Sequence, residues 1–159
     1  MTAGPKCRDL IKRSEDEAGF LAGHCTKLKA YRCPSGLWTC GWGHTRGISE
    51  ETTCTPEEAD RWLDEEITAV EEKLCYSVRV PVTQGMWDAL VCFVYNIRRS
   101  RWNDRDCRLL RWLNAGISKE RIAPEFNRWI YGTDPETKQK VKLPGLVKRR
   151  AAERELFVS

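Results

Sequence analysis

The segment from Thr55 to about Cys75 constrains the fold of this 159-residue chain more than any other. It opens with Thr-Pro-Glu-Glu, in which Thr55 can cap a helix, Pro56 suits the first turn and Glu58 completes a capping box. The sequence therefore predicts a long amphipathic helix that divides the chain into an N-terminal and a C-terminal part. Its apolar stripe would consist of residues at helical spacing: Ala59, Trp62, Leu63, Ile67, Val70 and Leu74.

The chain before this helix shows a short helical pattern and then a β pattern. Residues 6–18 place apolar side chains on one helix face, and the stretch 19–26 reads as irregular. Residues 28–43 read as two strand-like pieces joined by a turn. Strand period puts Thr39 on the face that also carries Gly41, so we expect room for a ligand beside the threonine.

The chain after the long helix reads as helical apart from one polar loop at 132–142. The sequence thus predicts a single α+β domain over residues 1–159, with a ligand cleft between two lobes. The predicted parts are a sheet lobe at 19–55, a connecting helix at 56–75, and a helical lobe at 76–159 plus 6–18. Within the helical lobe we expect a helix capped by Thr83 that reaches Ile97, one that carries Leu109, Leu110 and Leu113 and ends before Gly116, and two more near 118–131 and 146–157.

Composition excludes several classes of protein. With 41% hydrophobic and 31% charged residues, the chain is typical of globular domains rather than disordered ones. No apolar run approaches the roughly 20 residues of a membrane span, and the N-terminus is charged where a secretory signal is apolar. We therefore expect a soluble monomer without a signal peptide and without stable membrane insertion.

The eight cysteines allow a disulfide framework, a metal site or free thiols. Their density is below that of disulfide scaffolds, and several lie inside apolar patterns, so we expect mostly free thiols. The spacing of the one metal-like set matches no zinc pattern, so we expect neither a metal nor a cofactor. That set comprises His24, Cys25, Cys33, Cys40 and His44.

The run LKAYRCPSGLWTCGWGHT, residues 28–45, resembles the sheet segment of phage-type lysozymes, the endolysins related to the T-even phage lysozymes. The resemblance continues in family order through three further pieces that together reach nearly the whole chain. They are Phe93-Val-Tyr-Asn96, Phe126-x-Arg-Trp129 and Leu143-Pro-Gly-Leu-Val-Lys-Arg-Arg-x-x-Glu153. The resemblance implies a lysozyme-like fold and a bacteriolytic muramidase. Such an enzyme cleaves the β-1,4 bond between N-acetylmuramic acid and N-acetylglucosamine in peptidoglycan.

In this family a glutamate at the end of the first helix donates a proton, an aspartate or cysteine comes next, and a threonine then holds a water. The resemblance assigns the last two positions to Cys33 and Thr39, and substrate binding to Tyr31 and Asn96. Cys33 can equally be a packed free thiol. Hydrolysis of a glycosidic bond needs such a pairing of a proton donor with a group on the opposite face of the sugar.

The position of the acid stays open between three residues. The family spacing falls on His24, whose imidazole could donate a proton, and such a chain would be a catalytically impaired peptidoglycan-binding homologue or an unusual enzyme. If the connection to the sheet is longer by nine residues, the motif Leu-Ile-Lys-x-x-Glu ends at Glu15. Glu17 is the third candidate, because it flanks the same apolar stripe on the other side.

Two further features qualify the resemblance. Glu66 lies on the apolar face of the long helix and needs a partner, for which His44 is the natural candidate in a structural pair. After Asn96, where the family has a small residue and a glycine, this chain has Ile97 and Arg98, a departure typical of a divergent member, natural or artificial.

The run 98–111 carries six arginines. We interpret it first as a charged helix face, then as a means of attraction to anionic cell-wall polymers, and last as a nucleic-acid surface. A net charge of +4 is small for nucleic-acid binding, so we expect peptidoglycan and no nucleic acid as partner. The resemblance also implies residence in the host cytoplasm until a membrane-permeabilising partner such as a holin gives access to the cell wall.

Overall fold

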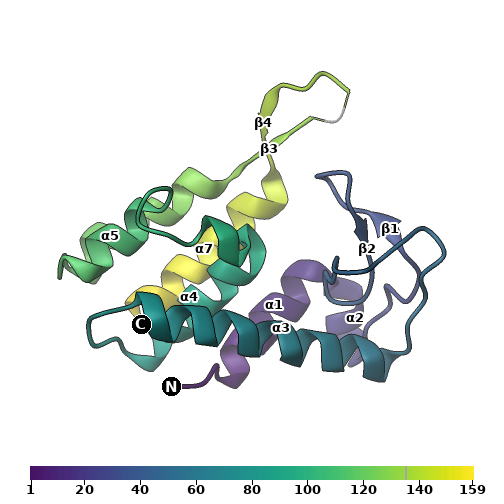
Figure 1. Cartoon of the computed structure of the whole chain (residues 1–159), viewed down its shortest axis with the longest axis horizontal. Helices are drawn as coiled ribbons and strands as arrows, with labels where there is room; N and C mark the ends of the chain where they lie inside the picture. Colours follow the sequence, from purple (N-terminus) through teal and green to yellow (C-terminus); the bar gives the residue numbers. More distant parts are fainter. Residues whose placement is uncertain (135) are drawn as a thin grey trace.

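The computed structural model describes residues 1–134 and 136–159, apart from the side chain of Arg99, and its fold is the predicted α+β class. Figure 1 shows the long helix α3 (Pro56–Ser77) leading from the first helices and the β1–β2 sheet to the remaining helices. The others are α1 (Pro5–Glu15), α2 (Glu17–Ala22), β1 (Tyr31–Arg32), β2 (Trp38–Thr39), α4 (Gln84–Ile97), the 3₁₀ turn η1 (Arg99–Arg101), α5 (Arg108–Asn114), α6 (Lys119–Ile122), the 3₁₀ helix η2 (Ala123–Trp129), β3 (Tyr131–Thr133), β4 (Lys140–Lys142) and α7 (Pro144–Val158).

Helix α3 begins as its sequence predicts. The Thr55 hydroxyl accepts a hydrogen bond from the Glu58 amide at 3.1 Å, and the Glu58 carboxylate accepts one from the Thr55 amide at 2.8 Å. The capping box is therefore complete. Five members of the predicted stripe are buried, and Trp62 is half-buried at the edge: the buried ones are Ala59, Leu63, Ile67, Val70 and Leu74.

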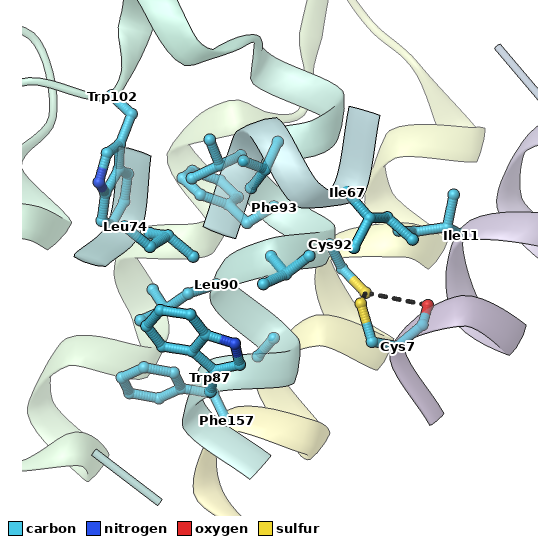
Figure 2. Packing of buried hydrophobic residues seen from close by; sticks show 14 of the residues in the cluster. Cys7, Ile11, Ile67, Leu74, Trp87, Leu90, Cys92, Phe93, Trp102 and Phe157 are labelled. Atoms are coloured by element: carbon cyan, nitrogen blue, oxygen red, sulfur yellow. Dashed lines mark hydrogen bonds between the residues drawn. The ribbon is translucent and has the colours of Figure 1, made fainter. Parts of the chain in front are cut away.

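Helix α4 forms the centre of the hydrophobic core and packs against α1, α3 and α7. Every residue from Trp87 to Val94 is buried. In Figure 2, Leu90 and Phe93 of this helix lie among side chains from its neighbours. The Phe93 ring meets Phe126 and Trp129 edge to face, with centroids 5.0 Å and 5.5 Å apart, a favourable geometry for aromatic pairs.

The N-terminal segment differs from the prediction of one helix over residues 6–18. The helix stops at Glu15 because Asp16 leaves helical geometry (φ −151°, ψ +84°), and α2 then covers part of the stretch expected to be irregular. The buried Asp16 carboxylate accepts hydrogen bonds from Gly19 N at 3.0 Å and from Thr26 N and Oγ1, each at 2.7 Å. One side chain therefore caps α2 and ties the end of this connection to its beginning.

The predictions for 118–142 are also wrong in detail. The expected helix over 118–131 is α6 followed by the 3₁₀ helix η2, because Pro124 cannot donate the hydrogen bond that an α-helix needs there. The expected polar loop contains an antiparallel hairpin that pairs Tyr131 with Lys142 and Thr133 with Lys140. In Figure 1 the hairpin stands out beyond the helices.

The sheet near the N-terminus is also a short antiparallel pair, in which Tyr31 faces Thr39 and Arg32 faces Trp38. The tight connection has Gly36 at φ +81°, and the Gly36 amide donates to the Cys33 carbonyl at 2.8 Å. After β2 the chain turns back at once, and Cys40 and His44 form an isolated bridge. Across the described residues, no helix is both long and apolar enough to cross a membrane.

Candidate active site

A cleft of about 1740 Å³ is lined on one side by the β1–β2 turn and on the other by the ends of α4, η2 and α7 and the β3–β4 hairpin. It brings together most of the residues that the sequence singles out. These are Glu15, Tyr31, Cys33, Thr39, His44, Glu66 and Asn96. Residues more than 60 positions apart therefore share one wall or face one another across one opening.

Glu15 is the last residue of α1, and its carboxylate is held by Arg149 of α7, with Oε1 2.5 Å from Nη1. Arg149 is buried, and it also donates to the Cys92 carbonyl at 3.0 Å and to Glu153 Oε1 at 3.1 Å. The Glu15 side chain is 19% exposed, so its carboxyl group is partly shielded from water but still reaches the cleft.

The turn after β2 is shaped to accommodate this carboxyl group. Gly43 has φ +92°, and a Cβ atom there would lie 2.7 Å from Glu15 Oε2. Only glycine combines that conformation with this close approach. Lys27 adds a further tie, because its Nζ donates to the Glu15 carbonyl at 2.6 Å.

The other two candidate acids lie elsewhere. Glu17 is exposed on α2, and its Oε1 lies 3.3 Å from Lys148 Nζ. His24 is exposed, and its Nδ1 lies 3.2 Å from the Cys25 carbonyl. Neither lines the cleft, so of the three candidates the geometry brings Glu15 alone to the site.

Thr39 is buried at the end of β2, and its hydroxyl donates to the Leu37 carbonyl at 3.1 Å. The space expected beside it at Gly41 does not exist, because a Cβ atom there would lie 3.1 Å from Ala59 Cβ. The chain leaves strand geometry at this glycine, which has φ +65°. The opening lies instead at Gly43, next to Glu15.

Cys33 lies in the turn that faces the hairpin, with Sγ 2.9 Å from Ser35 Oγ. Burial raises the pKa of the Cys33 thiol, but hydrogen bonds from the Ser35 hydroxyl and from the main-chain amides of Ser35 and Leu37 outweigh burial and bring this pKa below its ordinary value. The arrangement therefore favours the thiolate more than an ordinary cysteine does.

Two tyrosines near Glu15 stay neutral. Burial raises the pKa of Tyr31 well above its ordinary value, and the neighbouring Glu15 charge raises it further. Lys27 lies over the Tyr31 ring, 4.7 Å from its centroid. Burial likewise raises the pKa of Tyr95, whose hydroxyl donates to the Trp42 carbonyl at 2.7 Å. Both phenols can thus serve as hydrogen-bonding groups but not as charges.

The structure also brings His44 and Glu66 together. His44 Nδ1 and Glu66 Oε1 share a hydrogen bond, and the imidazole stacks on Trp62 with centroids 4.7 Å apart. Asn96 lines the cleft, and its Oδ1 accepts a hydrogen bond from Arg150. These contacts fix the orientations of the His44 ring and the Asn96 amide.

The buried arginines Arg149 and Arg150 were missed as functional residues by the sequence reasoning. The two adjacent arginines and Glu153 form a charged group inside the core, and both arginines reach cleft residues. Successive arginines within the apolar pattern of the last helix were the available signal. Among the described residues, no group of three or more His, Cys, Asp or Glu side chains could hold a metal ion.

Comparison with known proteins shows the family of the chain. Residues 23–153 match the family model of phage lysozyme. The endolysin of Acyrthosiphon pisum secondary endosymbiont phage 1 is 38% identical over 133 residues, which cover 84% of this chain and 88% of that protein. The endolysin of Salmonella phage P22 is 32% identical over 155 residues, which cover 94% of this chain and 92% of the relative.

Solved structures are similar over the whole chain. The muramidase domain of SpmX from Asticaccaulis excentricus has a TM-score of 0.81 at 28% identity, covering 99% of this chain and 98% of that one. An endolysin from the Escherichia coli O157:H7 phage FAHEc1 has a TM-score of 0.81 at 26% identity, covering 100% and 94%. The segment that matches the family model begins after Glu15, so the assignment of the acid rests on the geometry of the cleft. The chain belongs to the phage lysozyme family.

Proposed function

We propose that this chain is a muramidase that cleaves the β-1,4 bond between N-acetylmuramic acid and N-acetylglucosamine in peptidoglycan. The observation that carries the proposal is the placement of Glu15 and Thr39, which end α1 and β2, on one cleft with the carboxyl group held by Arg149. The whole chain then works as one catalytic domain, and the cleft is open enough to admit a polymer.

In the proposed mechanism, Glu15 protonates the oxygen of the leaving sugar. Arg149 keeps the carboxyl group in place and stabilises the negative charge that remains on it after the transfer. The turn at Gly43 keeps the carboxyl group packed against the main chain, which limits the positions it can adopt. The acid is therefore preorganised before the substrate binds.

Thr39 orients the attacking water. The Thr39 hydroxyl donates its proton to the Leu37 carbonyl next to β2. The hydroxyl oxygen is therefore free to accept a hydrogen bond from water. Water bound in this way presents a lone pair to the anomeric carbon. Cys33 lines the same part of the cleft, and in this mechanism its sulfur, when deprotonated, takes up the proton that the water loses. Attack from the face opposite Glu15 gives inversion.

Tyr31 and Asn96 bind the substrate as hydrogen-bonding groups at the two sides of the cleft. The pair of His44 and Glu66 keeps the turn after β2, which contains Gly43, in place. A catalytically impaired homologue would bind peptidoglycan in the same cleft without cutting it. That alternative predicts binding without new reducing ends, so the two functions are separated by a single assay.

The test is substitution of each candidate acid. We expect Glu15→Gln to lower the rate of turbidity loss of a cell-wall suspension by at least about 100-fold, the usual contribution of a general acid. Glu17→Gln and His24→Gln are the matched controls and should retain activity. Mass spectrometry of the products should find N-acetylmuramic acid at the new reducing ends. Full activity of a folded Glu15→Gln variant would refute the assignment of the acid.

A further inference from the structure

Helix α4 ends in a backbone conformation that its residue does not favour. Arg98 follows Ile97 with φ +73° and ψ +144°, in a region that glycine adopts readily and other residues avoid. A glycine would relieve this strain, yet the chain places there an exposed arginine that lines the cleft. Strain of this kind clusters at functional sites, which directs attention to the guanidinium group.

Arg98 is one of four cations on the side of the cleft formed by the end of α4, η1 and the β3–β4 hairpin that have no carboxylate within 4 Å among the described residues. We call this group the basic rim, and it comprises Arg98, Arg101, Lys138 and Lys140. Arg101 lies over the Trp129 ring, 4.8 Å from its centroid, and Lys140 over the Tyr131 ring at 4.7 Å. Aromatic surfaces thus hold two of the charges in place without neutralising them.

Other arginines of the 98–111 run are used differently. Arg108 pairs with Glu125, and Arg111 donates to the Asp104 and Arg105 carbonyls. On the hairpin, the Asp134 carboxylate accepts hydrogen bonds from the amides of the turn rather than pairing with the rim. The charge of the basic rim is therefore open to a ligand, whereas Arg108 and Arg111 are engaged within the fold.

We propose that the basic rim is an anion subsite that binds free carboxylates of the peptides attached to the glycan strand. This inference rests on the proposed function and names the part of the substrate that these residues recognise. The sugar chain itself is neutral apart from its substituents, whereas the peptides carry carboxylates at varied distances from it. Long, exposed cations beside aromatic surfaces suit such groups, since guanidinium and ammonium can follow a flexible ligand.

Binding measurements on polymers with and without free peptide carboxylates test the subsite. Every variant carries Glu15→Gln so that no strand is cut, and dissociation constants are measured with peptide-bearing glycan and with the same glycan after its peptide carboxylates have been converted to neutral amides. We expect Arg98→Gly and Arg101→Gln each to weaken binding of the peptide-bearing strands about two- to fivefold, the scale of an exposed ion pair. Binding of the amidated strands should not change.

Arg121→Gln is the matched control, since Arg121 is exposed on α6 outside the cleft and should affect neither polymer. Arg98→Gly should also melt no lower than the parent, which separates weaker binding from damage to the fold. Equal effects on both polymers, or none, would overturn the subsite. The subsite would also be overturned if Arg98→Gly and Arg101→Gln weakened binding only of a phosphate-bearing wall polymer, which would identify phosphate as the ligand.

The same reagents separate this inference from the proposed function. If chains with Glu15 release no reducing ends while the rim variants still weaken binding of peptide-bearing strands, the muramidase fails and the subsite stands. If turnover is present and the rim variants bind both polymers like the parent, only the subsite fails.

Discussion

Asp16 offers the sharpest test of how the connection between α1 and the β1–β2 sheet is held together. Its buried carboxylate accepts one hydrogen bond at Oδ1 from Gly19 N and two at Oδ2 from Thr26, and the Cys25 thiol also donates to Oδ2 at 3.8 Å. In Asp16→Asn the amide nitrogen would replace Oδ2 and face the Thr26 amide, donor against donor. Hydrogen bonds to a charged group contribute about 1.5–3 kcal/mol each, and the Thr26 hydroxyl can reverse its role. We therefore expect a loss of about 2–4 kcal/mol in the free energy of unfolding.

For a chain of this length that loss lowers the melting temperature by roughly 5–15 °C. The effect should depend on pH. Burial raises the pKa of Asp16, but the hydrogen bonds from Gly19 and Thr26, helped by the Lys27 charge, outweigh it and bring this pKa below 3.8. Because the folded-state pKa is depressed, the stabilisation is complete well above pH 3.8 and is lost as the pH falls through the folded-state value.

Denaturant unfolding from pH 7 down to about pH 3 measures both effects. The difference between the parent and Asp16→Asn should shrink as the parent itself becomes protonated at Asp16. Asp9→Asn, at an exposed position on α1, controls for the loss of one negative charge. A difference that stays constant down to the lowest pH, or one matched by Asp9→Asn, would refute the reasoning.

Two further predictions concern the turn after β2 and the thiols beside it. Gly43→Ala adds a methyl group 2.7 Å from the Glu15 carboxylate, so we expect at least about a tenfold loss of cell-wall turnover. Gly47→Ala has similar backbone strain (φ +71°) with open space around it and should lose far less; equal losses would contradict the steric explanation. The Cys40 and Cys54 sulfurs lie 3.3 Å apart, so exchange with glutathione disulfide should join them, with loss of one hydrogen from each thiol and about 3 kcal/mol of added stability. Burial raises the pKa of Cys54 to about 12, so the exchange should accelerate at alkaline pH; peptide mapping that finds only glutathione adducts would disprove this prediction.

The parts of the fold that the sequence predicts well are those determined by neighbouring residues. The capping box at Thr55 and Glu58 is local, and so is the stop at Gly116, which has φ +70° after α5. The cap at Thr83, which accepts from the Met86 amide, is equally local. Such signals need no knowledge of the rest of the chain, and the structure has them where the sequence indicates.

The features that the sequence does not reveal depend on distant contacts. Glu15 and Arg149 are 134 positions apart, and nothing near either residue indicates the other. The hairpin after η2 has only three residues in each strand, too few for an alternating pattern to stand out. The break at Asp16 results from the burial of a carboxylate that looked like one of three solvated acids.

The connection that begins at Asp16 closes on itself, which has a consequence for the sequence spacing of Glu15 and Thr39. Its far end is fastened to its near end through Thr26, and Lys27 reaches back to the main chain of Glu15. The separation of Glu15 from the sheet is therefore determined by these ties and not by the number of residues between them. A longer or shorter segment between Asp16 and Thr26 that keeps the same ties would leave Glu15 at the same place beside the cleft, so the sequence interval between Glu15 and Thr39 is a poor guide to their spacing in the structure.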